Sequence, residues 1–325
     1  MNRWVEPDMR DQILDFIDYW KDSCDLPESW LLERIELTRS RIHDWRIRAG
    51  TPNRHNGHIP RENWLTAEEM DAIIAFYSEH REDGYRRCSY MMIDRDIACS
   101  SPATVYRVLK KAGVMRSRGA VSSKKGKGFD QPLSPHEHWH TDISYIKISD
   151  RFYFLICVLD GFSRKILHWD LRENMRDRDV GIVMEGAREK HTDEHPRYIT
   201  DNGKQFTGRE FQKFIAIHGL THVTTSPYYP QSNGKLERFH GSVKTECIRR
   251  KALSGLDHAK SVITEYIDYY NNERLHSAIG YVTPADKLAG RAEIIQEERD
   301  QKLMNARIQR AKRNQTKKTK DNYAA

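Results

Sequence analysis

The sequence predicts an α/β protein in which a five-stranded mixed sheet, covered by helices, follows two all-helical domains. Helical patterns alone occupy the N-terminal third, strand patterns begin near His138, and strands and helices alternate after that residue. We expect helical domains at 1–60 and 61–117, a basic linker at 118–134, the α/β domain at 135–290 and a basic tail at 291–325.

The first helical domain ends in a basic helix. This helix begins after Thr38, a good N-cap residue, and ends before Gly50. Ile42 and Trp45 are spaced to pack inward. The pattern is typical of a helix-turn-helix unit, whose last helix enters a DNA major groove, although a plain three-helix bundle would look the same. The residues expected to contact DNA are Arg39, Arg41, His43 and Arg46.

The second helical domain repeats this organisation. It opens with a capping box from Thr66 to Glu69, and Ser101 is the expected N-cap of its last helix. Val105 and Leu109 face inward. Two such units in tandem favour a protein that reads DNA. The residues expected to contact DNA here and just beyond are Thr104, Tyr106, Arg107, Lys110, Arg116 and Arg118.

The charge distribution also indicates a polyanionic partner. The net charge is +7, and residues 107–129 and 302–320 each contain eight lysines and arginines and no acid. Such runs are often solvated faces of a protein, but two of them flanking one domain indicate that the binding partner is DNA or RNA.

Other classes of protein are excluded by composition. No run approaches the ~18 apolar residues of a membrane span, and no apolar signal segment follows Met1. The five cysteines are scattered without a C-x-x-C pair, so we expect a reduced, cytoplasmic protein associated with the bacterial nucleoid, without disulfides. His55 and His58 lack cysteine partners, so we expect no structural zinc.

The α/β domain is predicted from patterns of period two and period 3.6. The run 152–159 is continuously apolar, which is typical of a strand buried on both faces. Asp160-Gly161 signals a hairpin turn, and Thr207 with Glu210 forms a second predicted capping box. We expect strands at 138–148, 152–159, 165–171, 196–200 and 221–226, and helices at 177–191, 207–220, 235–247 and 255–275.

Three acids stand out by position. Asp142 lies inside the first strand, where an unpaired charge is unfavourable. Asp201 ends the fourth strand, and Glu237 lies near the start of a late helix, with 35 residues between the two acids. Each has an ordinary interpretation: an edge-strand polar residue, an Asp-Asn-Gly turn and an acid that favours the helix dipole. All three in this order are much less probable by chance.

Four stretches resemble the catalytic core of insertion-sequence transposases related to retroviral integrases: "HTDIS", "TDNGKQF", "SPYYPQSNGKLERFHGSVK" and "YNNERLHSAIGYVTPADKL". The similarity spans about 135–290. It implies a ribonuclease-H-like fold in which the first and fourth strands are adjacent. It also implies that Asp142, Asp201 and Glu237 are the catalytic, metal-binding residues. The lysine seven positions after the glutamate, Lys244, matches the same motif.

Coulomb's law supports this implication. Two carboxylates ~4 Å apart repel by about 4 kcal/mol at an effective dielectric of 20, so three would need cations to stay ionised together. Their oxygen ligands favour two Mg²⁺ ions, with Mn²⁺ as a substitute. On an ideal α-helix Glu237 and Lys244 point within about 20° of each other, with Gly241 between them leaving room for a DNA phosphate.

The sequence therefore predicts a DNA transposase that binds the ends of its own mobile element, cleaves them and joins their 3′-hydroxyls to target DNA. Its partners would be double-stranded DNA at the terminal inverted repeats and the target, and at least one further copy of the chain. A nuclease that only hydrolyses, or a DNA-binding regulator with an inactive core, is the alternative. Asn271, Arg274 and His276 also match the resemblance, but we expect them to pack the last helix on the sheet.

Overall fold

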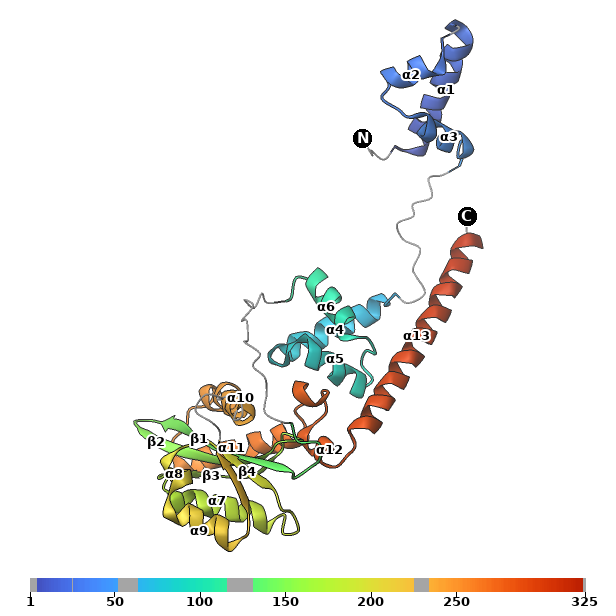
Figure 1. Ribbon diagram of the computed structural model, residues 1–325. Helices are drawn as coiled ribbons and strands as arrows, with labels where there is room; N and C mark the ends of the chain where they lie inside the picture. Colours follow the sequence, from blue (N-terminus) through green and yellow to red (C-terminus); the bar gives the residue numbers. More distant parts are fainter. Residues whose placement is uncertain (1–4, 25, 52–63, 116–130, 225–233, 324–325) are drawn as a thin grey trace. The chain divides into compact units, whose positions relative to one another are not determined.

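The computed structural model describes residues 5–24, 26–51, 64–115, 131–224 and 234–323, with side chains through residue 314. Contacts divide the chain into two compact units (Figure 1). The first comprises Met1–Trp64 with Lys312–Ala325, and the second comprises Leu65–Ala311.

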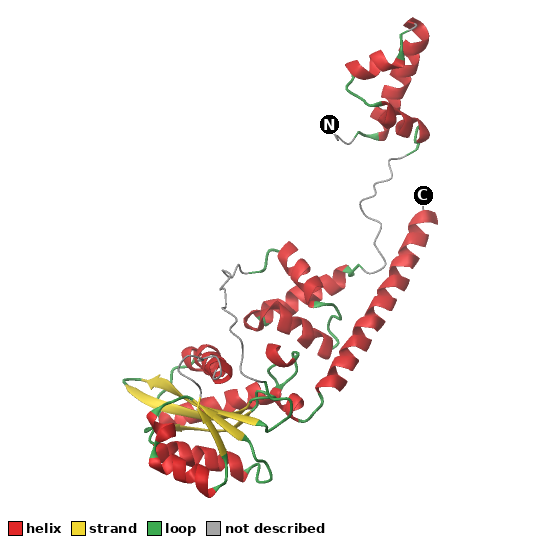
Figure 2. Cartoon of the chain, in the orientation of Figure 1, coloured by secondary structure: helices red, strands yellow, loops and turns green. Residues whose placement is uncertain are grey.

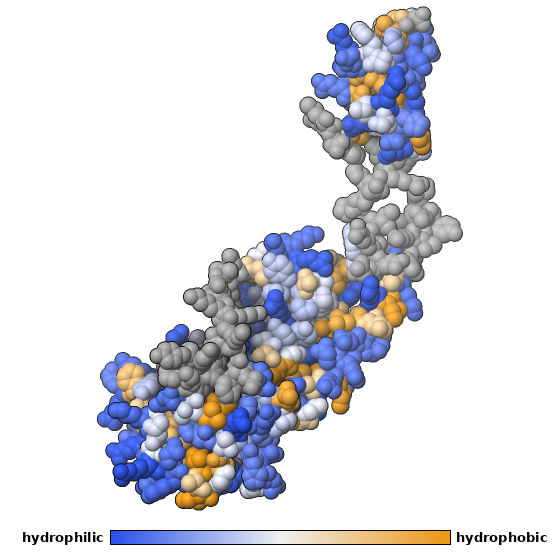
Figure 3. Space-filling view, in the orientation of Figure 1, coloured by the Kyte–Doolittle hydropathy of each residue, from blue (hydrophilic) through white to orange (hydrophobic). Residues whose placement is uncertain are grey.

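Three short helices form the core of the first unit. They are α1 (Pro7–Cys24), α2 (Glu28–Arg34) and α3 (Arg39–Ile47). Ile42 and Trp45 are buried as predicted, and they pack with residues of α1 and α2 such as Ile17 and Leu32. Thr38 caps α3 as expected, because its hydroxyl accepts the Arg41 N–H. The space-filling view shows hydrophilic residues around this small core (Figure 3).

Helices also form at the start of the second unit, in the predicted order. They are α4 (Ala67–Glu79), the short η1 (Arg81–Asp83), α5 (Gly84–Asp94) and α6 (Pro102–Lys111). The capping box is present: the Thr66 N–H donates to Glu69 Oε2 at 2.9 Å, and the Glu69 N–H donates to Thr66 Oγ1 at 3.2 Å. Ser101 caps α6, and Val105 and Leu109 are buried.

A five-stranded mixed sheet forms the centre of the α/β domain (Figure 2). Its strands are β1 (His138–Ile148), β2 (Arg151–Asp160), β3 (Ile166–Arg172), β4 (Arg197–Thr200) and β5 (Thr221–Thr224), in the order β3-β2-β1-β4-β5. β2 runs antiparallel to β1 and β3, whereas β4 runs parallel to β1 and β5. The first and fourth strands are therefore adjacent at the centre, as the ribonuclease-H-like fold requires.

Helices cover both faces of the sheet. One face packs against α7 (Asp177–Glu189), α8 (Lys204–Thr207) and α9 (Arg209–Ile217). The other packs against α10 (Gly234–Ser242), the π-helical η3 (Val243–Cys247), the 3₁₀ turn η4 (Ile248–Arg250) and α11 (Leu256–Asn272). β2 is buried between them: Ile156 and Val158 face α7, while Cys157 and Leu159 face the other side. This confirms that the continuous apolar run is a two-faced core strand.

The predicted capping box from Thr207 to Glu210 is wrong. Thr207 ends α8, and Gly208 is the N-cap of α9, without a side-chain cap. The Glu210 N–H instead donates to Asp177 Oδ2 at 3.3 Å. A carboxylate from α7 satisfies the helix start because tertiary packing brings it there, which local sequence cannot reveal.

The C-terminal residues continue as η5 (Ser277–Ile279), α12 (Pro284–Leu288) and the long α13 (Ala292–Tyr323). Two arginines of α13 form buried ion pairs within the second unit. The Arg299 guanidinium donates to the two carboxylate oxygens of Asp94 at 2.6 and 2.7 Å. The Arg310 guanidinium donates to Glu69 Oε1 at 2.7 and 2.9 Å. Part of the basic run that predicted a DNA-binding tail therefore serves internal packing.

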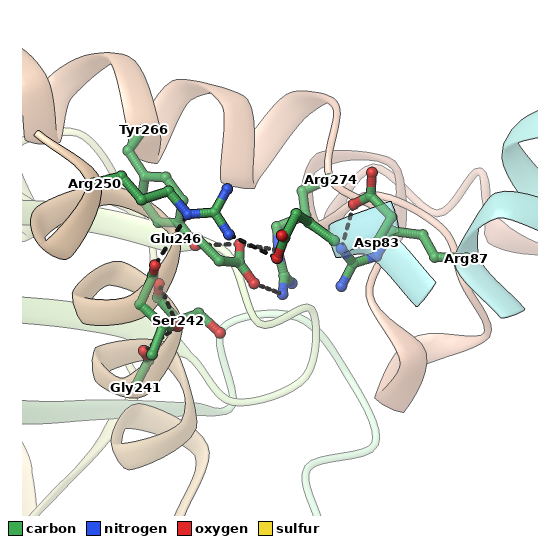
Figure 4. A network of polar contacts seen from close by, with 10 residues as sticks. Asp83, Arg87, Gly241, Ser242, Glu246, Arg250, Tyr266 and Arg274 are labelled. Carbon is green, nitrogen blue, oxygen red and sulfur yellow. Dashed lines mark hydrogen bonds and ion pairs between the residues drawn. The ribbon is translucent and has the colours of Figure 1, made fainter. Parts of the chain in front are cut away.

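Two motif residues at and just after the end of α11 bond to neighbouring elements. Asn271 clamps β3, because its side chain accepts the Ile166 N–H at 2.9 Å and donates to the Ile166 carbonyl at 3.0 Å. Arg274 forms a two-pronged ion pair with Glu246 of η3 at 2.7 and 2.9 Å (Figure 4). The Tyr266 hydroxyl also donates to Glu246 at 2.9 Å. These bonds join the end of the α10–η3 segment to α11.

Loss of this ion pair is expected to destabilise the protein. Burial raises the pKa of Glu246, but hydrogen bonding to Arg274 and the Arg274 charge outweigh it and hold that pKa below 4.5. Because breaking a buried pair leaves a charge unpaired, and because Glu246 is partly exposed, we expect Glu246→Gln to lower the unfolding free energy by about 2–3 kcal/mol. Urea unfolding at pH 7 measures this loss.

The matched control is Glu265→Gln, which removes the exposed partner of Lys251 and should cost less than about 0.5 kcal/mol. A lowered pKa means that the Glu246 contribution is complete above pH 4.5 and disappears as pH falls through the folded-state value. Equal losses in the two variants, or a Glu246→Gln loss unchanged at acid pH, would contradict the assignment.

Candidate active site

Two of the three predicted acids lie side by side on the central strands. The parallel register pairs Trp139 with Tyr198 and His140 with Ile199. Continuing it by two residues places Asp142 beside Asp201, on strands that run about 4.7–4.9 Å apart. Asp201 follows the last residue of β4, and its Oδ1 accepts the Gly203 N–H at 2.9 Å. The first and fourth strands therefore bring two carboxylates together.

The two carboxylates influence each other electrostatically. Burial raises the pKa of Asp201 above its ordinary 3.8, the hydrogen bond from Gly203 opposes this, and the negative charge of Asp142 raises it further. Two acids that resist joint ionisation in a partly buried position favour the binding of a cation between them.

Asp142 projects from the sheet face that α10 covers. Alternate residues of β1 share a face, and Ile146 belongs to the core cluster that contains Leu236 and Phe239 of α10. His240, from the same helix, places Nδ1 3.5 Å from Asp142 Oδ2. On the neighbouring strand β2, Cys157 lies opposite Asp142, and burial together with the Asp142 charge holds the pKa of its thiol well above its usual range. Asp142 therefore lies at the contact between the sheet and α10.

Glu237 lies on the exposed side of α10, in its first turn. Within the described ranges, no three acidic, histidine or cysteine side chains are close enough together to hold a metal ion. The structure thus brings Asp142 and Asp201 together and leaves Glu237 outside a three-acid group. Repulsion supplies a physical reason, because a third carboxylate beside this pair is unfavourable without a cation.

Lys244 does not follow the ideal helix assumed from the sequence. α10 ends at Ser242, and Lys244 lies in the π-helical η3, so the ideal α-helix on which the 20° alignment was based does not extend to Lys244. Gly241 lies between them, exposed, and a Cβ added there would meet nothing within 4 Å. The space expected beside Gly241 is present.

The N-terminal candidate residues occupy the surface of α3. Arg39, His43 and Arg46 are exposed, and the Arg41 guanidinium lies 5.2 Å from the centre of the Trp45 ring. Arg46 also forms ion pairs, with Asp18 at 2.7 Å and with Glu28 at 3.2 Å. These pairs tie α3 to α1 and α2, so Arg46 has a structural role in addition to the DNA contact predicted for it.

The candidates on α6 also lie on its outer side. Tyr106, Arg107 and Lys110 are exposed and Thr104 is partly exposed. Arg107 donates to the Thr104 hydroxyl at 3.1 Å, which orders these two side chains relative to each other. Arg116, Arg118 and the tyrosines of "SPYYPQ" fall outside the described residues.

Sequence reasoning did not assign a role to His240. Its position in the sequence indicated that it could lie near the candidate acids. His240 follows Glu237 by three residues, and residues three apart on a helix are neighbours on its surface. Burial against Asp142, however, follows from how α10 sits on the sheet, and no local pattern encodes that.

Comparisons with known proteins agree with this geometry. Two family models described as "Integrase core domain" match residues 132–230 and 218–284, and together they include Asp142, Asp201 and Glu237. The chain is 24% identical over 268 residues to the transposase for insertion sequence element IS629 of Shigella sonnei, covering 79% of this chain and 89% of that protein.

It is also 33% identical over 137 residues to a protein of insertion element IS136 of Agrobacterium fabrum, covering 40% of this chain and 70% of that protein. The chain belongs to the insertion-sequence DDE transposases. Among solved structures, the transposase is similar to the catalytic core of HTLV-2 integrase in complex with magnesium, at 21% identity and a TM-score of 0.40, covering 48% of this chain and 97% of that one.

The transposase is thus a polynucleotidyl transferase with an integrase-like core of ribonuclease-H-like fold. Across its described segments, no helix has the length and apolar character to cross a bilayer.

Replacement of Asp201 by asparagine is expected to stabilise the transposase in the absence of metal. The substitution removes repulsion by Asp142 and keeps an oxygen that can accept the Gly203 N–H. We expect the midpoint of thermal unfolding at pH 7 in EDTA to rise by roughly 2–4 °C, which corresponds to about 1 kcal/mol for a domain of this size. Calorimetry measures the shift.

Because the pKa of Asp201 is raised, its ionised form costs stability at neutral pH, and this cost disappears as pH falls below the ordinary 3.8. The advantage of Asp201→Asn should therefore shrink in acid. Asp257→Asn, outside the site on α11, is the control. A variant less stable than the wild type at pH 7 would show that Asp201 is held by favourable contacts rather than repelled.

Proposed function

We propose that this transposase recognises the ends of its own mobile element, cleaves them, and transfers the 3′-hydroxyl strands to target DNA. One observation carries the proposal: the central parallel strands of an integrase-type core place Asp142 next to Asp201. Acids so placed serve metal-assisted phosphoryl transfer.

We infer a divalent metal cofactor at these acids. Asp142, Asp201 and Glu237 would hold it, as two Mg²⁺ ions with Mn²⁺ as a substitute, since carboxylate oxygens suit both metals. The mutual repulsion of Asp142 and Asp201 fits a cation site. When bound, the ions would supply activation of the attacking oxygen and stabilisation of the leaving oxygen in an in-line displacement.

The remaining residues would position DNA. Lys244 and the open surface at Gly241 lie on the segment that carries Glu237, where a phosphodiester backbone can approach. α3 and α6 are the last helices of the two helical domains. Each would enter a major groove of the DNA, as in helix-turn-helix proteins, and its outward basic side chains would contact the DNA there. Joining two ends would require a homo-oligomer, at least a dimer, assembled on DNA.

The triad assignment has a direct test. Asp142→Asn and Glu237→Gln each remove one metal-binding charge, and we expect each to lower the rate of joining of pre-nicked end DNA by at least ~10³-fold, the scale of losing an electrostatic group at the reacting phosphate. Gel assays with Mg²⁺ measure joining, and filter binding measures end affinity, which should change little.

Glu210→Gln, an exposed acid on the opposite sheet face, is the control and should join normally. Hydrolysis without joined product in the wild type would support the nuclease alternative. Normal joining by Glu237→Gln would remove Glu237 from the site.

The open surface at Gly241 gives a second test. Alanine fits without contact and favours a helix by about 0.5–1 kcal/mol, so Gly241→Ala should raise the stability of the free transposase. If a phosphate approaches closely, the same methyl group should weaken end binding and joining. Stability and DNA affinity are measured on one preparation. Increased stability with unchanged affinity would show that DNA does not approach Gly241.

A further inference from the structure

The connection between β2 and β3 holds an arginine whose charge is not matched. Arg164 has a φ of +68° and is partly buried. Its Nε and Nη1 atoms are buried without a hydrogen-bond partner, and Nη2 makes one long bond of 3.5 Å to Gln131 Oε1. Within the described part of the chain, Arg164 forms no ion pair. A partly buried guanidinium with open N–H groups is unfavourable unless something binds there.

The nearest buried acid does not supply the missing partner. Asp160 is fully buried and lies at the end of β2, four residues before Arg164. Its Oδ1 accepts the His136 N–H at 2.9 Å. Its Oδ2 accepts the Ser163 N–H at 2.7 Å and the Ser163 hydroxyl at 2.6 Å. Asp160 therefore shapes the turn, and Nε and Nη1 of Arg164 stay buried without a hydrogen-bond partner.

Two further cations from α10 face the same place. Lys235 donates to the Gly161 carbonyl at 3.1 Å, which joins α10 to this turn. Burial and the Arg238 charge lower the pKa of Arg164, while Tyr270 and the Asp160 charge oppose this, so Arg238 and Asp160 are both within electrostatic range of Arg164. Arg238 is exposed and forms no ion pair with a described residue. Burial and the Arg164 charge lower the pKa of Lys235 to about 7, so this amine is only partly charged at neutral pH. Two arginines and one partly charged lysine thus gather around one turn, where Asp160 is the buried acid.

A buried histidine adjoins this group. His140 is 1% exposed, and neither of its ring nitrogens has a hydrogen-bond partner. Its Nε2 would lie 3.0 Å from a Cβ built on Gly161, so the ring reaches the same turn. His140 precedes Asp142 by two residues, about 7 Å along the strand. His140 and Asp142 share one face of β1, so the turn that His140 reaches lies close to the candidate active site.

We propose that Arg164, with Lys235 and Arg238, binds a phosphodiester of the DNA strand adjacent to the phosphate at the Asp142–Asp201 pair. This inference rests on the proposed function. Guanidinium N–H groups donate charge-assisted hydrogen bonds to phosphate oxygens, and DNA carries a phosphate every 3.4 Å along each strand. A bound phosphate would neutralise charge that the free protein leaves unmatched.

A purely structural role for Arg164 predicts the opposite stability effect. A structural arginine is bonded within the fold, so its removal destabilises, as for Arg274 with Glu246. An arginine retained to bind a ligand lowers the stability of the free protein. Its removal therefore leaves the unfolding free energy unchanged or raises it, while ligand binding weakens. Stability and DNA affinity together therefore separate the two roles.

The test compares the full-length wild type with Arg164→Met, which keeps an unbranched apolar stem and removes the charged guanidinium. We expect the thermal midpoint of Arg164→Met to equal or exceed that of the wild type. We expect its affinity for end DNA to fall about tenfold, and the slope of log K against log salt to become shallower by about 0.9, the value for one lost phosphate contact. An unrelated duplex should show the same loss, because phosphates carry no sequence information.

Arg209→Met is the matched control: it removes an exposed arginine from α9, on the opposite sheet face, and should leave affinity and slope unchanged. A drop in the thermal midpoint of Arg164→Met would overturn the proposal in favour of a structural role. An unchanged salt slope would overturn the proposal as well. If inorganic phosphate stabilises the wild type while the salt slope of Arg164→Met is unchanged, the site binds a free anion rather than DNA.

The two levels of inference fail separately. If the wild type does not join end DNA, the proposed function fails whatever Arg164 does. If the wild type joins DNA and Arg164→Met binds with the same affinity and slope, the phosphate site alone is rejected.

Discussion

The parallel pairing of β1 with β4 is the constraint on which the rest of this structure depends. It places Asp142 beside Asp201, although 58 residues separate them in the chain. The energetic consequence is visible in Asp201, whose pKa rises because of burial and because Asp142 is near. A core strand that carries an acid is unfavourable for folding alone. The cost is understandable in a transposase, where a cation and a phosphodiester would relieve it.

The surrounding architecture keeps this pair in place. β2 is buried on both faces and holds β1 from the other side, while α7 and α9 cover one face and α10 and α11 the other. The α10–η3 segment is secured at its far end by the Glu246–Arg274 ion pair and at its near end by the bond from Lys235 to Gly161. The segment that carries Glu237 is thus attached at two points, with its exposed side free to meet DNA.

The same surface joins the acids proposed to hold metal to the basic residues proposed to bind DNA. Asp142 and Asp201 repel each other, and Arg164 lies near Lys235 and Arg238 with two N–H groups that have no hydrogen-bond partner. Each group is unfavourable in the free protein. Both would become favourable if divalent ions and a phosphate backbone bound together as proposed, which would explain why a polynucleotidyl transferase retains them.

Local patterns in the sequence determined the strands, most helices and the caps at Thr38, Thr66 and Ser101, because periodicity and capping depend on neighbouring residues. The acids could be selected through a resemblance that covers the core. Tertiary structure alone decided that Asp177 caps α9, that the π-helical η3 replaces the α-helix before Lys244, that Asp142 contacts His240, and that two N–H groups of Arg164 lack a hydrogen-bond partner. Each of these depends on contacts between distant segments, and spacing along the chain carries no record of such contacts.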